Sequence, residues 1–163
     1  MNQQLFLLNM KIINPKKFKY NKKLDNNEVK SCDFCSSKIY KMQGCKSLEG
    51  KYWKILVNLY PYMDGNLMII PKRHIVKIDE IKNDEWEEFH EIILKTQKKL
   101  TEIFKTKSFN VGINIGKSAG SSIPHMHWQI MPRRKWIPNF ANIVGDMYII
   151  TVTPEKLKKL IDE

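Results

Sequence analysis

Two of the chain's four histidines lie two residues apart, as His125 and His127, and Gln129 follows at the same spacing. Polar and apolar residues alternate here, which predicts a β-strand whose side chains point to opposite faces in turn. His125, His127 and Gln129 then share one face. Met126 and Trp128 lie on the other face, which is apolar and suits a core. The strand is expected to present two imidazoles and one amide side by side.

A neutral imidazole can act as a nucleophile or as a metal ligand, and its ordinary pKa of about 6.5 leaves it uncharged at neutral pH. A turn-rich loop with Gly116, Gly120, Ser121 and Ser122 precedes the histidines. Backbone N–H groups and hydroxyls in such a loop suit phosphate oxygens, so a histidine beside it suggests attack on phosphorus. The spacing alone equally allows one histidine to be a ligand, the other to be structural, and the loop to be a plain turn.

Cys32 and Cys35 form a Cys-x₂-Cys pair, whose spacing can place two thiolates on one zinc ion. The pair supplies half of a tetrahedral site, and His74 and His125 are candidates for the other half. The alternative is a knuckle without metal. Cys45 has no partner in this scheme, and we expect it to be a bystander.

The elements that must position these residues follow from hydrophobic periodicity. Apolar residues at spacings of about three and four predict one long helix from Asp79 to Lys105, which serves as scaffold for the sheet. β-forming residues between turn signals predict the strands. The predicted strands span residues 52–59, 67–70, 109–115 and 147–152, and a short terminal helix spans 154–161.

The length of 163 residues suits one domain with its own core. We expect residues 1–23, which are basic and contain no acid, to form an N-terminal arm, and residues 24–163 to form the single domain. No apolar run approaches the ~20 residues of a membrane span, and residues 5–8 are too short a run for a signal peptide. The expectation is a soluble, cytoplasmic protein without a membrane partner.

The formal net charge is +11, which attracts polyanions such as nucleotides, polyphosphates, nucleic acid or anionic lipid. We interpret most of the lysines as a solvated surface. Nucleic acid is therefore not expected to be a main partner.

The run from Asn114 to Arg133 resembles the signature of the histidine triad (HIT) superfamily. In that signature a phosphate-binding loop precedes two histidines separated by a hydrophobic residue, and a third polar residue and a Pro-Arg pair follow. His125 and His127 occupy the histidine positions. Gln129 departs from the commonest pattern, which has histidine there, and resembles the nucleotidyltransferase and dinucleotide phosphorylase branches more than the hydrolases.

The resemblance implies an α+β, HIT-like fold, with about five mostly antiparallel strands, an ordinary number for a sheet, and one long helix packed on them. It also implies a homodimer. Among the residues, it implies that His127 is the nucleophile, Gln129 a donor to the transferred phosphate, Asn58 a ligand of the ribose hydroxyls, and Asn114, Gly120, Ser121 and Ser122 phosphate ligands. The implied ligands of a structural Zn²⁺ are Cys32, Cys35, His74 and His125. For Asn58 the residues themselves also allow a strand-end side chain that hydrogen-bonds its own turn.

A glutamine cannot shuttle a proton, so Gln129 favours leaving groups and acceptors that are already ionised. Polyphosphate and inorganic phosphate meet that condition, whereas water needs a base. We therefore predict phosphorolysis of diadenosine tetraphosphate to ATP and ADP, through a covalent nucleotidyl-histidine at His127, with a nucleoside polyphosphate and inorganic phosphate as partners. The alternatives are a HIT-type nucleotide hydrolase, a sugar-1-phosphate uridylyltransferase, and a non-catalytic, zinc-stabilised nucleic-acid-binding module.

Overall fold

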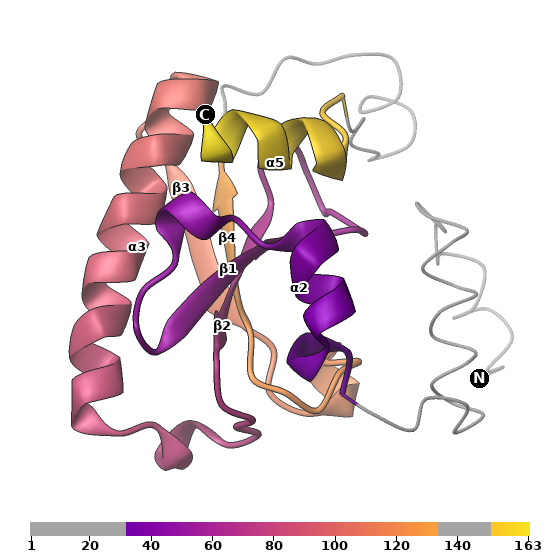
Figure 1. The fold of residues 1–163 in the computed structure, drawn as a ribbon, viewed down its shortest axis with the longest axis vertical. Helices are drawn as coiled ribbons and strands as arrows, with labels where there is room; N and C mark the ends of the chain where they lie inside the picture. Colours follow the sequence, from indigo (N-terminus) through magenta and orange to yellow (C-terminus); the bar gives the residue numbers. More distant parts are fainter. Residues whose placement is uncertain (1–31, 134–150) are drawn as a thin grey trace, which may run out of the picture. The chain divides into compact units, whose positions relative to one another are not determined.

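The computed structural model describes residues 32–133 and 151–163. Within them a four-stranded sheet has the strand order β1-β2-β4-β3, and every neighbouring pair is antiparallel. Helices lie on both faces of this sheet (Figure 1). The strands are β1 (Trp53–Val57), β2 (Leu67–Pro71), β3 (Phe109–Ile113) and β4 (Trp128–Pro132), and the helices are α2 (Ser37–Gln43), α3 (Asn83–Phe104) and α5 (Pro154–Asp162).

The predicted α+β architecture is confirmed, including the antiparallel sheet and the long helix that packs along it. A fifth strand was expected over residues 147–152, but all of that range except Thr151 and Val152 lies outside the described residues. The predicted basic arm, residues 1–23, lies outside them too. In the part of the chain that the structure describes, no helix combines the length and the apolar composition needed to cross a membrane.

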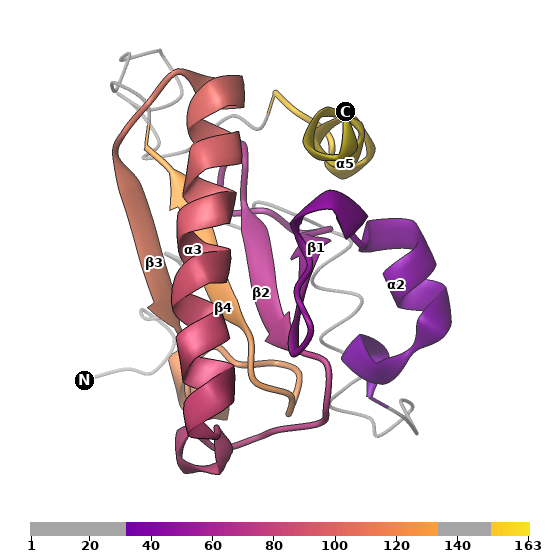
Figure 2. The same ribbon diagram turned by 60° about the vertical axis from the view of Figure 1, so that its left-hand side comes forward.

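The larger core lies between α3, α5 and one face of the sheet (Figure 2). Strands β1 and β2 are buried along their whole length, because both of their faces are covered. The main buried side chains of this core are Trp53, Ile55, Val57, Leu67, Ile69, Phe89, Ile92, Leu100, Ile130, Leu157 and Ile161. Burial of so much apolar area is the dominant force that holds the sheet to its helices.

The smaller core lies on the opposite face, under α2 and the Cys-x₂-Cys knuckle. Phe34 of the knuckle packs there with Leu56 of β1 and with Met68 and Ile70 of β2. The knuckle is thus held against the sheet by apolar contacts as well as by its thiols. Helix α2, which follows it, was not predicted, because seven residues are too few to show a helical period.

Helix α3 begins at Asn83 rather than at Asp79, so the predicted start was wrong. Ile78–Glu80 form a separate 3₁₀ turn, and the extended backbone of Lys82 interrupts the helical path before α3. The carboxylate of Glu85 accepts a hydrogen bond from the Lys82 N–H at 2.8 Å and so caps the helix.

Strand β4 begins at Trp128, so His125 and His127 precede the strand instead of lying within it. The main chain there finds partners outside the ladder: the Met126 N–H donates to the Ile75 carbonyl at 2.7 Å. The predicted division of faces is nevertheless correct. Met126 belongs to the core under α3, whereas His127 contacts Phe34 on the opposite face.

Candidate functional site

Two thiols and two imidazoles meet in one cluster of possible metal ligands, formed by Cys32, Cys35, His74 and His125. One ligand atom from each residue lies within 4.8 Å of all the others. The His125 Nδ1 atom is 3.3 Å from the Cys32 Sγ atom and 3.5 Å from the Cys35 Sγ atom. The His74 Nδ1 atom is 3.5 Å from the Cys35 Sγ atom. A tetrahedral zinc places its sulfur and nitrogen ligands roughly 3.5 Å apart, so this spacing suits zinc.

The chemistry of the donor set also suits a cation. Burial and the adjacent Cys35 thiol raise the pKa of Cys32. Two neighbouring thiolates therefore need a compensating positive charge. Burial lowers the pKa of His125 to about 4, so its imidazole is neutral and has a lone pair to donate at neutral pH.

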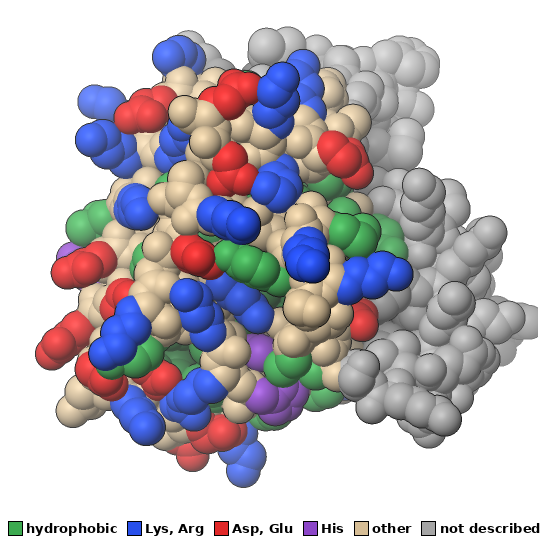
Figure 3. All heavy atoms as spheres, viewed as in Figure 1, with side chains coloured by type: hydrophobic (Ala, Val, Ile, Leu, Met, Phe, Trp, Pro, Cys, Tyr) green, Lys and Arg blue, Asp and Glu red, His purple; other side chains and the backbone are tan. Residues whose placement is uncertain are grey.

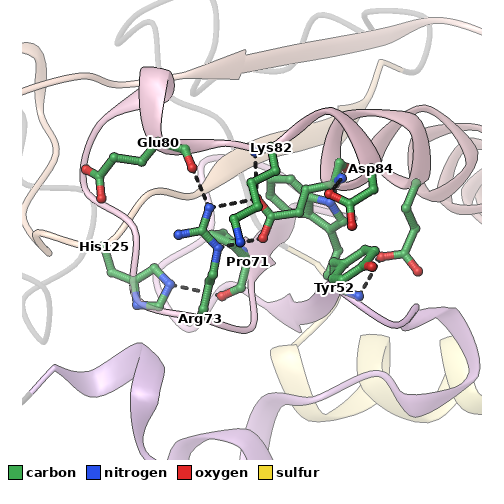
Figure 4. Close-up of polar contacts among 10 residues, drawn as sticks. Tyr52, Pro71, Arg73, Glu80, Lys82, Asp84 and His125 are labelled. Carbon is green, nitrogen blue, oxygen red and sulfur yellow. Dashed lines mark hydrogen bonds and ion pairs between the residues drawn. The ribbon is translucent and has the colours of Figure 1, made fainter.

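The ring orientation of His125 is set by the end of strand β2. Its Nε2 atom lies 3.0 Å from the Pro71 carbonyl oxygen (Figure 4). Because a carbonyl only accepts, Nε2 carries the proton and Nδ1 faces the thiols with its lone pair. This pattern, in which the outer ring nitrogen donates to a carbonyl, is the usual support of a metal-binding histidine.

The loop that carries His74 is fixed by an ion pair with α3. The Arg73 guanidinium contacts both oxygens of Glu85, at 2.6 and 2.7 Å, and also donates to the Glu80 carbonyl (Figure 4). Glu85 is buried, and the Arg73 guanidinium lowers the pKa of its carboxyl. The long helix therefore helps to place one of the four candidate ligands.

Phe34 links the metal cluster to the second histidine of the pair. Its ring makes edge contacts with His125 at 5.9 Å and with His127 at 5.1 Å between centroids. Phe34 lies between the two knuckle cysteines in the sequence and is buried. A change in the position of the knuckle would therefore alter the packing around His127.

The tautomer of His127 is defined by the backbone. Its Nδ1 atom lies 2.8 Å from the His125 carbonyl oxygen and must donate to it. The Nε2 atom is left with its lone pair, which is the form that a nucleophile or a general base requires. Burial lowers the pKa of His127, so its imidazole stays neutral to a lower pH than an ordinary imidazole does.

Gln129 lies at the end of a chain of three amides. Asn66 Nδ2 donates to Gln129 Oε1 at 2.8 Å, and Asn58 Nδ2 donates to Asn66 Oδ1 at 2.9 Å. Asn58 Oδ1 in turn accepts from the Tyr60 N–H at 2.9 Å. Asn58 therefore does hydrogen-bond its own turn, as one interpretation of the sequence allowed, while its contact with a ribose stays a prediction. Asn66 is fully buried. The sequence did not indicate it as a site residue, because there it is one of several polar residues in a turn.

Open space lies beside Gln129 on the neighbouring edge strand. Gly112 of β3 is the cross-strand partner of Gln129, so the two residues share a face of the sheet. A Cβ atom placed on Gly112 would meet no atom of the described residues within 4 Å. Among these residues, the face that carries Gln129 is thus covered over β1 and β2 and open over β3.

The predicted phosphate loop is a compact turn. It contains a 3₁₀ turn, Lys117–Ala119, between Gly116 and Gly120, whose φ angles are +86° and +92°. The N–H groups of Gly120 and Ser121 donate within the loop, to Lys117 and Gly116. The amide nitrogen of Asn114 lies 3.3 Å from the position of a Cβ on Gly120.

The N–H groups of Gly120 and Ser121 close the turn by donating within the loop. The binding of phosphate by these two residues stays a prediction. The hydroxyl of Ser121 donates to the Ile123 carbonyl at 3.3 Å and can still accept a hydrogen bond. Ser122 is exposed, and its binding of phosphate stays a prediction.

Surface charge is mixed on the side of the molecule that carries α2 and α5. Lys and Arg side chains are interspersed there with Asp and Glu, and histidine atoms reach the surface (Figure 3). This face lacks the single-sign stripe that nucleic-acid binding favours. Cys45, the expected bystander, is buried in the larger core apart from the cluster, and the remaining histidine, His90, is exposed on α3.

Comparison with known proteins gives one family match. The model of the HIT domain matches residues 45–136. The chain is 30% identical over 120 residues to an AP-4-A phosphorylase of Mycobacterium tuberculosis, which covers 73% of this chain and 62% of that protein. It is 32% identical over 100 residues to a bis(5'-adenosyl)-triphosphatase of Saccharomyces cerevisiae, which covers 61% of this chain and 46% of that protein. The chain thus spans less than two thirds of the length of either relative.

A solved structure shares the fold. The Zn-bound histidine triad family protein of Mycobacterium smegmatis superposes with a TM-score of 0.63 at 19% sequence identity. The match covers 81% of this chain and 91% of that protein. At this level of identity the similarity supports the arrangement of strands and helices only.

Proposed function

This chain belongs to the HIT family, and we propose that it cleaves diadenosine tetraphosphate by phosphorolysis, with an adenylyl group carried on His127. The observation that supports this best is the hydrogen bond from His127 Nδ1 to the His125 carbonyl at 2.8 Å. It leaves a neutral, buried Nε2 lone pair on the face that carries Gln129. Such a group can attack phosphorus without first losing a proton.

The proposed reaction has two displacements. The His127 Nε2 lone pair attacks the α-phosphorus of the dinucleotide, and the P–O bond to the rest of the substrate breaks with its electron pair on oxygen, which releases ATP. An oxygen of inorganic phosphate then attacks the same phosphorus, and the P–N bond breaks with its electron pair returning to Nε2. The second product is ADP, and the imidazole is regenerated in its starting tautomer.

Gln129 suits this pair of acceptor and leaving group. Its amide can donate a hydrogen bond to a phosphate oxygen but cannot take up or supply a proton at neutral pH. ATP leaves as an ion and phosphate attacks as an ion, so neither step needs proton transfer from this position. Water would need a base to attack, which makes hydrolysis the less favoured outcome.

The metal cluster has a structural role in this proposal. Cys32, Cys35, His74 and His125 would hold one zinc ion, which would tie the knuckle to the segments on either side of the site. A histidine triad protein of similar fold is described as Zn-bound, which agrees with this assignment. Phe34, between the two cysteines, then keeps the ring of His127 covered.

The relatives support the cleavage of dinucleoside polyphosphates more firmly than they support inorganic phosphate as the acceptor. One is named a phosphorylase and the other a triphosphatase, so phosphate and water both remain in the family's range. Hydrolysis is therefore the second candidate. We further propose a homodimer, as the resemblance implied, that works in the cytoplasm.

The test is a product analysis with the purified full chain. Diadenosine tetraphosphate is incubated with and without inorganic phosphate, and the nucleotides are separated. ATP and ADP that form only with phosphate support the proposal. ATP and AMP, or two ADP, formed without phosphate make the protein a hydrolase. No turnover under either condition contradicts both and favours the nucleic-acid-binding alternative.

A further inference from the structure

Asn66 is a fully buried polar residue in the turn before β2, and four hydrogen bonds engage its side-chain amide. Its Oδ1 atom accepts from the Tyr62 N–H at 3.2 Å and from Asn58 Nδ2 at 2.9 Å. Its Nδ2 atom donates to the Leu67 carbonyl at 3.2 Å and to Gln129 Oε1 at 2.8 Å. Two hydrogens and two lone pairs of this amide are thus in use.

The backbone decides which way the Asn66 amide points. A main-chain N–H can only donate, so the Tyr62 N–H requires an oxygen on its side of the amide. A main-chain carbonyl can only accept, so Leu67 requires the nitrogen on the other side. The orientation of the Asn66 amide is therefore determined by two backbone groups.

This orientation is passed on to Gln129. The nitrogen of Asn66 faces Gln129, so Gln129 must turn its oxygen towards Asn66, and Asn58 Nδ2 adds a second contact to the same oxygen at 3.5 Å. The Gln129 nitrogen then points away from the amide chain. A free glutamine would sample both orientations, and half of them would present an oxygen to an anionic substrate.

Gln129 and the ring of His127 lie on the same face of the sheet. Gln129 is the cross-strand partner of Met68, which packs with Phe34, and Phe34 contacts the His127 ring. Gly112, the other partner of Gln129, leaves space beside it on this face. A phosphate next to His127 can therefore meet the N–H groups of Gln129.

We propose that Asn66 is a positioning residue that fixes the amide of Gln129 with its nitrogen towards the transferred phosphate. This inference rests on the proposed function of His127 and Gln129. Asn66 does not touch the substrate and acts only through Gln129. Its effect should therefore vanish when Gln129 is absent.

The experiment is a double-mutant cycle with Asn66→Asp and Gln129→Ala, measured with diadenosine tetraphosphate and phosphate. The aspartate keeps an acceptor for Tyr62 and Asn58 but faces Gln129 with an oxygen, so Gln129 has to reverse and present its own oxygen to the phosphate. Loss of one correctly placed donor costs about 10²-fold in kcat, with KM changed much less. In the Gln129→Ala background, Asn66→Asp should lower kcat by less than about twofold, because no amide is left to orient.

Two controls separate orientation from damage. Asn83→Asp makes the same chemical change at an exposed position of α3 and should leave kcat unchanged. If the Asn66→Asp variant does not fold, Asn66→Ala takes its place in the double-mutant cycle, because it removes the donor without adding charge. Equal losses of kcat in both backgrounds would overturn the proposal and make Asn66 a general structural residue.

An NMR measurement tests the orientation of Gln129 without relying on turnover of the proposed substrate. The side-chain NH₂ signals of Gln129 are assigned in ¹⁵N–¹H spectra by their absence in Gln129→Ala. Asn66→Asp should shift them, because the NH₂ group then donates to a carboxylate, whereas Asn83→Asp should not. If the wild type turns over no dinucleotide, the proposed function fails but the spectra still decide the orientation. Unmoved signals in Asn66→Asp would overturn the inference on their own.

Discussion

The Nδ1 atom of His127 lies 2.8 Å from the main-chain carbonyl oxygen of His125, two residues earlier in the chain. The same two residues therefore share three tasks. The ring of His125 faces the thiols, its carbonyl sets the tautomer of His127, and the Nε2 atom of His127 is left with its lone pair. The alternating pattern brings a candidate metal ligand and a candidate nucleophile together without any other element between them.

His127→Ala should abolish turnover while nucleotide binding survives, because the substitution removes the attacking lone pair and little of the binding surface. We expect kcat to fall by at least about 10⁴-fold, comparable to the loss of a nucleophile in other covalent enzymes. Binding of a non-cleavable dinucleotide, measured by calorimetry, should change by less than about tenfold. Turnover that persists at one-tenth of the wild-type rate would contradict covalent catalysis at this residue.

The pH profile should reflect the burial of His127. At pH 6 roughly three-quarters of an ordinary imidazole is protonated and cannot attack phosphorus. Burial lowers the pKa of His127, so the acid limb of kcat/KM should lie below the pH at which an ordinary imidazole is half protonated. Phe34→Ala removes one of the covering rings and should move the acid limb of the profile to higher pH. An acid limb at pH 6.5 in the wild type, or one that Phe34→Ala leaves in place, would contradict this account.

The sequence correctly predicted the faces of the histidine segment because the side chains still alternate between two faces where the chain is not hydrogen-bonded as a strand. His125 and His127 precede β4, yet Met126 still enters the core under α3. The metal cluster was also foreseeable, since cysteine and histidine types at such spacings have few other uses. Both features depend on short stretches of chain with strong local signals.

The contacts around Gln129 could not be predicted in the same way. Asn66 and Gln129 are 63 residues apart in the chain, and they meet only because β2 pairs with β4. Gly112 enters the site through the pairing of β3 with β4. Such contacts follow from tertiary pairing, about which local patterns carry little information.

Gln129→His should shift the products towards hydrolysis. Histidine can supply and take up a proton near neutral pH, so water becomes a competent acceptor at the second step. We expect the ratio of phosphate-independent to phosphate-dependent turnover to rise by about 10²-fold or more, since general acid–base effects span 10²–10⁴-fold. The ratio is measured from AMP and ADP formed with and without phosphate. An unchanged ratio would show that residue 129 does not select the acceptor.

Loss of the proposed zinc ion should destabilise the protein. Cys35→Ser takes away one of the four ligands, so zinc content should fall from about one per chain to nearly none. A loss of about 3 kcal/mol would lower Tm by roughly 6–12 °C for a domain of this size. Cys45→Ala is the control, because Cys45 lies in the larger core, and it should retain zinc. Full zinc content in Cys35→Ser, or none in the wild type, would contradict the assignment.

Gly112→Val should block the substrate without harming the fold. The position faces open space, and its backbone lies in a regular strand, where a β-branched side chain is well tolerated. Since Gly112 pairs with Gln129, the new methyl groups would occupy the space beside the amide that we assign to the substrate. We expect Tm to stay within about 2 °C of the wild type, as for most surface substitutions, while kcat/KM falls by about tenfold or more. Gly112→Ala adds only one carbon, so its kcat/KM should lie between the values of the wild type and of Gly112→Val. A valine variant with full activity would show that the substrate does not use this face, and a large loss of Tm would show that the space is not open in solution.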